Sequence, residues 1–216
     1  MTAVLVIANK AYSSWSFRPW ILMRHFGAPF EEIVVPLARP QTREEILRHS
    51  PAGKCPILKD GDALVWESLA IVEYFAETHP ELPVWPRERA ARAEARALAA
   101  EMHAGFTGLR ALLPMNMRRK PSPLPLTPEA SADVARLEAA FSGARGRFGA
   151  GGPFLFGDFS AADAMFAPVV NRLDVYAVPV GAPTRAYMEA MKALPAWRDW
   201  SAGAFAEPWI IEKYEK

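Results

Sequence analysis

The sequence predicts a small α/β domain followed by an all-helical domain, and three observations support this fold class. Short β-branched runs alternate with helical segments over the first eighty residues. Three prolines then fall within the seven residues from Pro80 to Pro86, which is typical of a linker. Beyond it, stretches rich in Ala, Arg, Glu and Leu favour helices. We therefore expect one domain over residues 1–80 and a second over residues 87–216.

The elements of the first domain are predicted from apolar runs and from the turn residues between them. Gly27 ends the first helix, an Asp-Gly pair at 60–61 favours a hairpin, and Pro80 stops the last helix. In chain order we expect a strand at 3–8, a helix within 13–26, a strand at 33–35, a helix at 42–48, strands at 56–58 and 63–65, and a helix at 67–78.

The second domain is expected to consist of helices and one proline-rich loop at 121–128. One helix is predicted over residues 87–113, and the next places apolar residues at alternating spacings of three and four. Those apolar residues are Val134, Leu137, Phe141, Ala144 and Phe148. Glycines between 143 and 152 are expected to end that helix, and shorter helices start near Ser160, Pro183 and Pro195.

Composition excludes several function classes. Hydrophobic residues make up 51% of the chain and charged residues 23%, which is typical of a globular protein. Lys and Arg number 25 against 24 Asp and Glu, so the basic surplus of a nucleic-acid-binding protein is missing. A single cysteine excludes an internal disulfide and fits a reducing compartment. The sequence has no apolar run long enough to cross a membrane and no signal-like start, so we expect a cytoplasmic protein without a membrane partner. Its four histidines are scattered, so we expect no metal site.

The most informative segment is Ser13-Ser14-Trp15-Ser16, where a predicted strand leads into a predicted helix. The first turn of a helix presents free N–H groups and stabilises an anion, and hydroxyl groups there can donate further hydrogen bonds. A serine that merely caps the helix is the simpler alternative, and the segment taken alone favours it. The spacing also matches the Cys-x-x-Cys of redox proteins with hydroxyls in place of sulfur, so any reactive thiol has to come from a ligand.

Two further segments fit a ligand that resembles a peptide. Cys55 precedes Pro56 at a strand start, where we expect a small buried residue, and the sequence alone favours a trans bond between them. Glu67 and Ser68 open a helix and can bind the ammonium and carboxylate of an amino acid. Ordinary helix capping explains the same pair and is favoured when the pair is considered in isolation.

Together these segments resemble one family. Ser13-Ser14-Trp15-Ser16-Phe17-Arg18, the segment from Ser50 to Leu58, and Glu67-Ser68-Leu69-Ala70-Ile71 look like the motifs of a cytosolic glutathione S-transferase. The first is most similar to the Ser-Ser-Cys-Ser-x-Arg motif of the zeta class and also to the Ser-Pro-Phe motif of tau enzymes. Residues 157–163 resemble the capping box of the family's helical domain, with Ser160 and Asp163 as its pair.

The resemblance implies a thioredoxin-like N-terminal domain that binds glutathione and an all-α C-terminal domain that shapes an apolar pocket. Ser13 would donate a hydrogen bond to the glutathione sulfur, with Ser14 in reserve. Residues implied to bind the rest of glutathione are Cys55 through its backbone beside a cis Pro56, Glu67 and Ser68 at the γ-glutamyl end, and Lys54 and Gln41 at the glycyl carboxylate. Pocket candidates are Trp15, Met102, Phe106, Met115 and Met117.

Three functions then remain open. The first is a detoxifying transferase that conjugates glutathione, as co-substrate, to a small hydrophobic electrophile. The second is a glutathione-dependent isomerase of zeta type, although Trp15 stands where that class has cysteine. The third is a non-catalytic relative that uses the fold for binding. The family also implies a homodimer.

Overall fold

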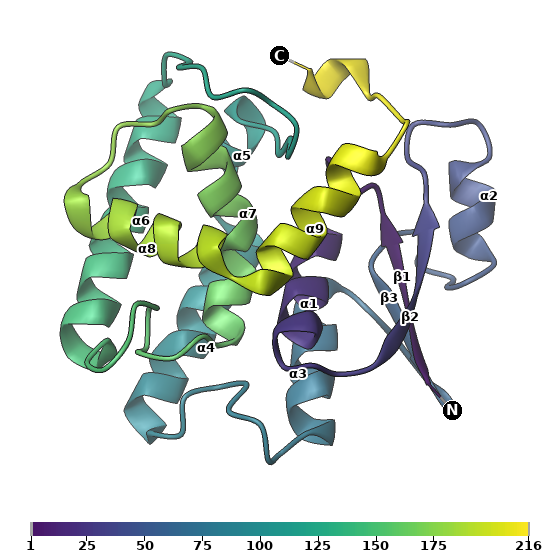
Figure 1. Cartoon of the computed structure of the whole chain (residues 1–216), viewed down its shortest axis with the longest axis horizontal. Coiled ribbons are helices and arrows are strands. Elements are labelled where there is room, and N and C mark those ends of the chain that lie inside the picture. Colours follow the sequence, from purple (N-terminus) through teal and green to yellow (C-terminus); the bar gives the residue numbers. More distant parts are fainter. Residues whose placement is uncertain (1, 216) are drawn as a thin grey trace.

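Four strands form one mixed sheet in the N-terminal part of the computed structural model, which describes residues 2–215 (Figure 1). The strands are β1 (Ala3–Ala8), β2 (Phe30–Val35), β3 (Ile57–Asp60) and β4 (Ala63–Trp66). Their order in the sheet is β2-β1-β3-β4. Strand β1 runs parallel to β2 and antiparallel to β3, and β4 returns antiparallel through the predicted hairpin. The chain has a thioredoxin-like N-terminal domain, as expected.

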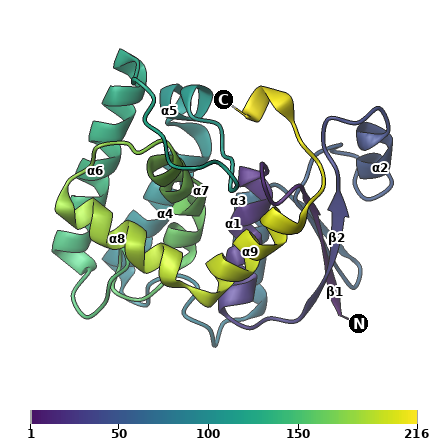
Figure 2. The same cartoon turned by 45° about the horizontal axis from the view of Figure 1, so that its top comes forward.

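Alternating residues of the strands bury both faces of this sheet. Helices α1 (Ser14–His25) and α3 (Ser68–Thr78) cover the face that carries Leu5 and Leu58. The short helix α2 (Thr42–Leu47) covers the other face, where Ile46 packs against Val6 and Ile57 (Figures 1 and 2). Because α1 follows β1 directly, its N-terminus lies at the carboxyl end of a central strand.

The remaining helices form an all-α unit beside α1 and α3 (Figure 2). In chain order they are α4 (Arg89–Ala104), α5 (Thr107–Leu112), α6 (Pro128–Phe148), α7 (Ala161–Val175), α8 (Ala182–Ala193) and α9 (Pro195–Ala206), followed by a short 3-10 turn at Glu212–Tyr214. Within residues 2–215 no helix is long and apolar enough to cross a membrane.

Helix α7 is the centre of the helical unit, because only Asp174 of its fifteen residues is not buried. It packs against α1, α4 and α8, so it joins the two domains. The predicted capping box at its start is confirmed: the Asp163 carboxylate accepts a hydrogen bond from the Ser160 N–H at 2.9 Å.

The predicted helix over 87–113 is wrong at one place, because the chain breaks between α4 and α5. Phe106 adopts a left-handed conformation with φ of 53° and buries its ring, which turns the chain. A Cβ atom on Gly105 would lie 2.8 Å from the Glu101 carbonyl oxygen, so this residue permits the turn. Gly143 and Gly146 were expected to end the next helix but lie inside α6, which Gly149 terminates.

Candidate active site

Helix α1 begins with a connected set of serine hydroxyl groups. Ser13 is the N-cap, and its Oγ accepts the Ser16 N–H at 3.4 Å. The Ser13 and Ser16 hydroxyls are 2.8 Å apart, and the Ser16 Oγ also accepts the Ala8 N–H at 3.0 Å. Because a hydroxyl can donate and accept, this pair can reverse so that Ser16 donates to Ser13. The Ser13 proton is then free for an anion at the helix N-terminus.

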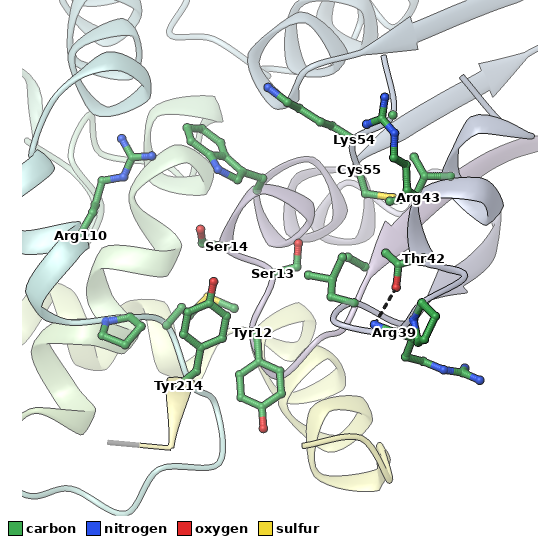
Figure 3. A pocket seen from close by; sticks show the side chains of 18 of the residues that line it. Tyr12, Ser13, Ser14, Arg39, Thr42, Arg43, Lys54, Cys55, Arg110 and Tyr214 are labelled. Carbon is green, nitrogen blue, oxygen red and sulfur yellow. Dashed lines mark hydrogen bonds between the residues drawn. The ribbon is translucent and has the colours of Figure 1, made fainter. Parts of the chain in front are cut away.

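Ser14 differs from Ser13 in its surroundings. It is the first residue of α1, and its hydroxyl makes no hydrogen bond within the described part of the chain. Both side chains point from the first turn toward the same space (Figure 3). The structure therefore presents two hydroxyls to a ligand. The Ser13 hydroxyl is hydrogen-bonded to Ser16, and the Ser14 hydroxyl makes no hydrogen bond in the described chain.

A cavity of about 550 Å³ opens above these serines, between the two domains (Figure 3). Its walls come from the loop after β1, from α2 and its preceding loop, from the segment before β3, and from α5, α7 and the C-terminal turn. The sequence-predicted residues that line it are Ser13, Ser14, Trp15, Lys54, Cys55 and Met115. Segments far apart in the sequence thus meet at the N-terminus of α1.

The cavity is strongly cationic. Its charged lining residues are Arg39, Arg43, Lys54, Arg110 and Arg172, and within residues 2–215 none of them forms a salt bridge. No carboxylate lines this cavity among the described residues. Arg39, Arg43 and Lys54 lie on the thioredoxin-like side and Arg110 on the helical side (Figure 3). Arg172 belongs to α7 and so also lies on the helical side. Such a lining favours a ligand with more than one negative group.

The two arginines on the helical side are held by backbone carbonyl groups. Arg172 is buried, and its Nε and Nη1 donate to the carbonyls of Leu113 and Pro168 at 2.8 and 3.1 Å. Burial, with the charge of Arg110, lowers the pKa of Arg172 to about 10, so it stays charged at neutral pH. Burial also lowers the pKa of Arg110, whose guanidinium lies 4.7 Å from the centre of the Trp15 ring.

Cys55 lies in the cavity wall, and the peptide bond between it and Pro56 is cis. Burial raises the pKa of the Cys55 thiol to about 12. A thiol of that pKa carries almost no thiolate at neutral pH, so it cannot act as a nucleophile.

Seven of the predicted site residues do not line this cavity. Gln41 is exposed just before α2, and Pro56 is buried at the start of β3. Met102 and Phe106 pack into the main hydrophobic core, so their side chains do not reach the ligand space. Met117 is buried in the same core.

Glu67 and Ser68 form a separate feature at the start of α3. Glu67 has a φ of 75°, and its carboxylate lies 3.5 Å from the His103 Nε2. The Ser68 hydroxyl is fully buried and has no hydrogen-bond partner in the described chain. Burial lowers the pKa of His103 and the Glu67 charge opposes this effect.

Sequence reasoning missed most of the cationic lining and two tyrosines. Arg172 could have been singled out from the sequence, because it is the one cation in the largely apolar segment that forms α7. Tyr12 and Tyr214 lie 5.8 Å apart, ring to ring, and both line the cavity. No sequence signal linked them, because they are separated by almost the whole chain.

Comparison with known proteins shows which family this chain resembles in sequence and in fold. Residues 12–78 match the model of the glutathione S-transferase N-terminal domain, and residues 117–203 match that of the C-terminal domain. The chain is 32% identical over 108 residues to a probable maleylacetoacetate isomerase of Caenorhabditis elegans. It is also 32% identical over 145 residues to a zeta-class glutathione S-transferase of Euphorbia esula.

These matches cover half of the first relative and 64% of the second, and the same shares of this chain. A glutathione transferase homologue from a Burkholderia, solved with bound glutathione, superposes with a TM-score of 0.72 at 24% identity. That superposition covers 96% of this chain and all of the other, so the fold is shared throughout. Both domains match models of one family, so the chain belongs to the glutathione S-transferases, and its curated relatives include a zeta-class enzyme.

Proposed function

We propose that this protein is a glutathione transferase that binds glutathione in the cationic cavity and activates its thiol at the N-terminus of α1. The hydroxyl relay formed by Ser13 and Ser16, in which Ser16 also accepts the Ala8 N–H, is the observation that supports this most directly. When the pair reverses so that Ser16 donates to Ser13, the Ser13 proton is free for a thiolate in the cavity. Serial hydrogen bonds polarise one another, which strengthens the last donor of the chain.

The energies are sufficient for this role. A thiol of pKa ~8.5 is only a few per cent ionised at neutral pH. Making thiolate the main form requires a pKa about two units lower, or ~2.7 kcal/mol. One hydrogen bond to a charged acceptor contributes about 1.5–3 kcal/mol and a helix N-terminus ~0.3–1 kcal/mol.

Within this proposal, each wall of the cavity has a role. The glycyl carboxylate of glutathione pairs with Lys54 and with Arg43 or Arg39 of the α2 region, while the backbone of Cys55 holds the cysteinyl part. Glu67 and Ser68 bind the γ-glutamyl end. Gln41 stays a weaker candidate because it is exposed and outside the cavity.

The electrophile occupies the helical side, beside Trp15 and Met115. These residues supply the apolar surface expected for a small hydrophobic electrophile. Arg110 and Arg172 lie on the same side, so they favour an electrophile that also bears a negative group.

Replacing the two serines separately tests the proposal. We expect Ser13→Ala to lose at least about tenfold in turnover with glutathione, since one charge-assisted hydrogen bond is removed. Ser14→Ala should lose less, because Ser14 has no relay behind it. Ultraviolet absorbance of the bound thiolate near pH 6.5 measures the ionisation directly. Full turnover and a full thiolate signal in both variants would refute the site assignment.

A glutathione-dependent isomerase is the second candidate, supported by the name of the Caenorhabditis elegans relative and by the arginines that suit an acidic substrate. An isomerase returns glutathione unchanged, whereas a transferase consumes it, so measuring the glutathione left after complete reaction distinguishes them.

We further propose a cytoplasmic homodimer with a role in detoxification. Sedimentation of the purified protein as a monomer at all concentrations would reject the dimer.

A further inference from the structure

The side chain of Arg18 is not explained by the hydroxyl relay or by the cavity walls. It is fully buried in α1, with 0% of its surface exposed. Its Nε donates to the Met165 carbonyl of α7 at 3.0 Å. Both terminal nitrogens are buried without a hydrogen-bond partner in the described chain. A guanidinium ordinarily stays charged in proteins, so this is a buried charge that is largely uncompensated.

The charged groups around Arg18 do not neutralise it. Arg110 of α5 and Arg172 of α7 both disfavour its charge, and Glu67 before α3 is the single carboxylate that favours it. The Glu67 side chain is 49% exposed and lies against His103 of α4, so water screens its charge. Arg18, Arg110 and Arg172 thus lie close together, and Glu67, whose charge water screens, is the one carboxylate that acts on Arg18.

Arg18 also points toward the reactive end of α1. Side chains on a helix lean toward its N-terminus, and Ser14 lies four residues before Arg18 on the same face. The contact with Trp15 confirms this direction, because the Arg18 guanidinium carbon lies 4.0 Å from the centre of that ring. Trp15 also lines the cavity, so one ring contacts both the buried charge and the ligand space.

Resting on the proposed function, we propose that Arg18 is a positioning residue whose buried charge acts across the Trp15 ring and stabilises the thiolate of glutathione bound at the N-terminus of α1. An aromatic ring excludes water from the intervening space, so the field is screened less than that of a surface charge. The charge adds to the helix dipole and to the serine hydroxyls. It does so without touching the ligand.

A purely structural role explains Arg18 poorly. Burying an unpaired charge costs stability, and a neutral side chain of similar length could fill the same space. The single hydrogen bond to Met165 does not require a charge. Residues that cost stability in this way are characteristic of functional sites.

The test is the thiol pKa of bound glutathione, followed by ultraviolet absorbance across pH, in wild type and in Arg18→Met, Arg18→Lys and Arg24→Met. We expect Arg18→Met to raise that pKa by about one unit. Its turnover should fall about fivefold at pH 6.5, in proportion to the thiolate fraction, and recover at high pH, where the thiol ionises unaided. Arg18→Lys should keep most of the effect. Arg24→Met is the matched control, because Arg24 lies on the same helix, half-exposed and paired with Asp199.

Thermal unfolding completes the test, since Arg18→Met should be as stable as wild type or more stable. An unchanged thiol pKa in Arg18→Met would overturn the inference, as would weaker glutathione binding with an unchanged pKa. If Arg18→Met does not fold, Arg18→Gln provides the neutral comparison, and failure of both to fold shows a structural charge and also overturns it. Absence of any saturable thiolate signal in wild type would instead reject the proposed function itself.

Discussion

Asp163 shows how one buried carboxyl group makes stability depend on pH. It is fully buried at the start of α7 and accepts hydrogen bonds from the N–H groups of Leu155 and Ser160. Burial raises its pKa to about 6, and these hydrogen bonds only partly oppose that effect. Since the unfolded chain has the ordinary pKa of ~3.9, the folded state holds the proton more tightly. The contribution of Asp163 is therefore greatest at low pH and is lost as pH rises from about 4 to 6.

We accordingly expect Asp163→Asn to remove this pH dependence while keeping one acceptor in the capping box. Relative to the variant, wild type should lose up to roughly 2 kcal/mol of unfolding free energy between pH 4 and pH 7. Denaturant unfolding of both proteins at each pH measures the difference. Ser160→Ala serves as the control, because it weakens the capping box without removing the titrating group. A gap between wild type and Asp163→Asn that is the same at both pH values contradicts the expectation.

At the scale of elements, Arg118 holds the C-terminal segment 207–215 beside the cavity through hydrogen bonds. The Arg118 guanidinium donates to the carbonyls of Glu207 and Trp209 at 2.8 and 2.7 Å and to the Tyr12 hydroxyl at 2.5 Å. The Glu207 carboxylate in turn accepts the N–H groups of residues 10 and 11, directly before the reactive serines. The same segment continues to Tyr214, which lies in the cavity wall and whose carbonyl accepts a hydrogen bond from the Asn116 side chain at 3.1 Å.

Arg118→Ala should therefore loosen this segment and remove the Tyr214 ring from its place. We expect the KM for the electrophile to rise several-fold, because part of its pocket is lost. The thiolate signal of bound glutathione should persist, because the Ser13 relay is untouched. Lys120→Ala is the matched control, since this exposed neighbour in the same basic run makes no such contacts. A fall in the thiolate signal alone, with KM unchanged, would refute this role of the segment.

The sequence also shows which elements can be predicted and why others cannot. Strands β1, β3 and β4 and helices α1 and α3 follow from local apolar runs and turn residues, and the capping box of α7 follows from its motif. The break at Phe106 was missed because helix-forming residues continue on both sides of it. The role of Arg118 was missed because its partners lie about ninety residues away, where only tertiary contacts bring them together.

At the scale of the whole molecule, charge is separated in space even though its sum is near zero. The net charge is +1, yet the cavity carries five cationic residues and no carboxylate among the described residues. The sequence total therefore concealed a local positive potential. Such a potential raises the association rate and affinity of a small anion, and salt weakens both.

Glutathione binding should accordingly depend on ionic strength. Raising salt from about 0.05 to 0.5 M shortens the screening length to less than half, so we expect Kd to rise several-fold. Arg43 and Lys54 are exposed and should account for most of this change, whereas the buried Arg172 is screened much less. The double variant Arg43→Gln/Lys54→Gln should therefore bind more weakly at low salt and respond little to added salt. Isothermal titration at both salt concentrations measures each Kd. Equal salt dependence in the variant and in wild type would show that the cations on the thioredoxin-like side do not bind the carboxylates of glutathione.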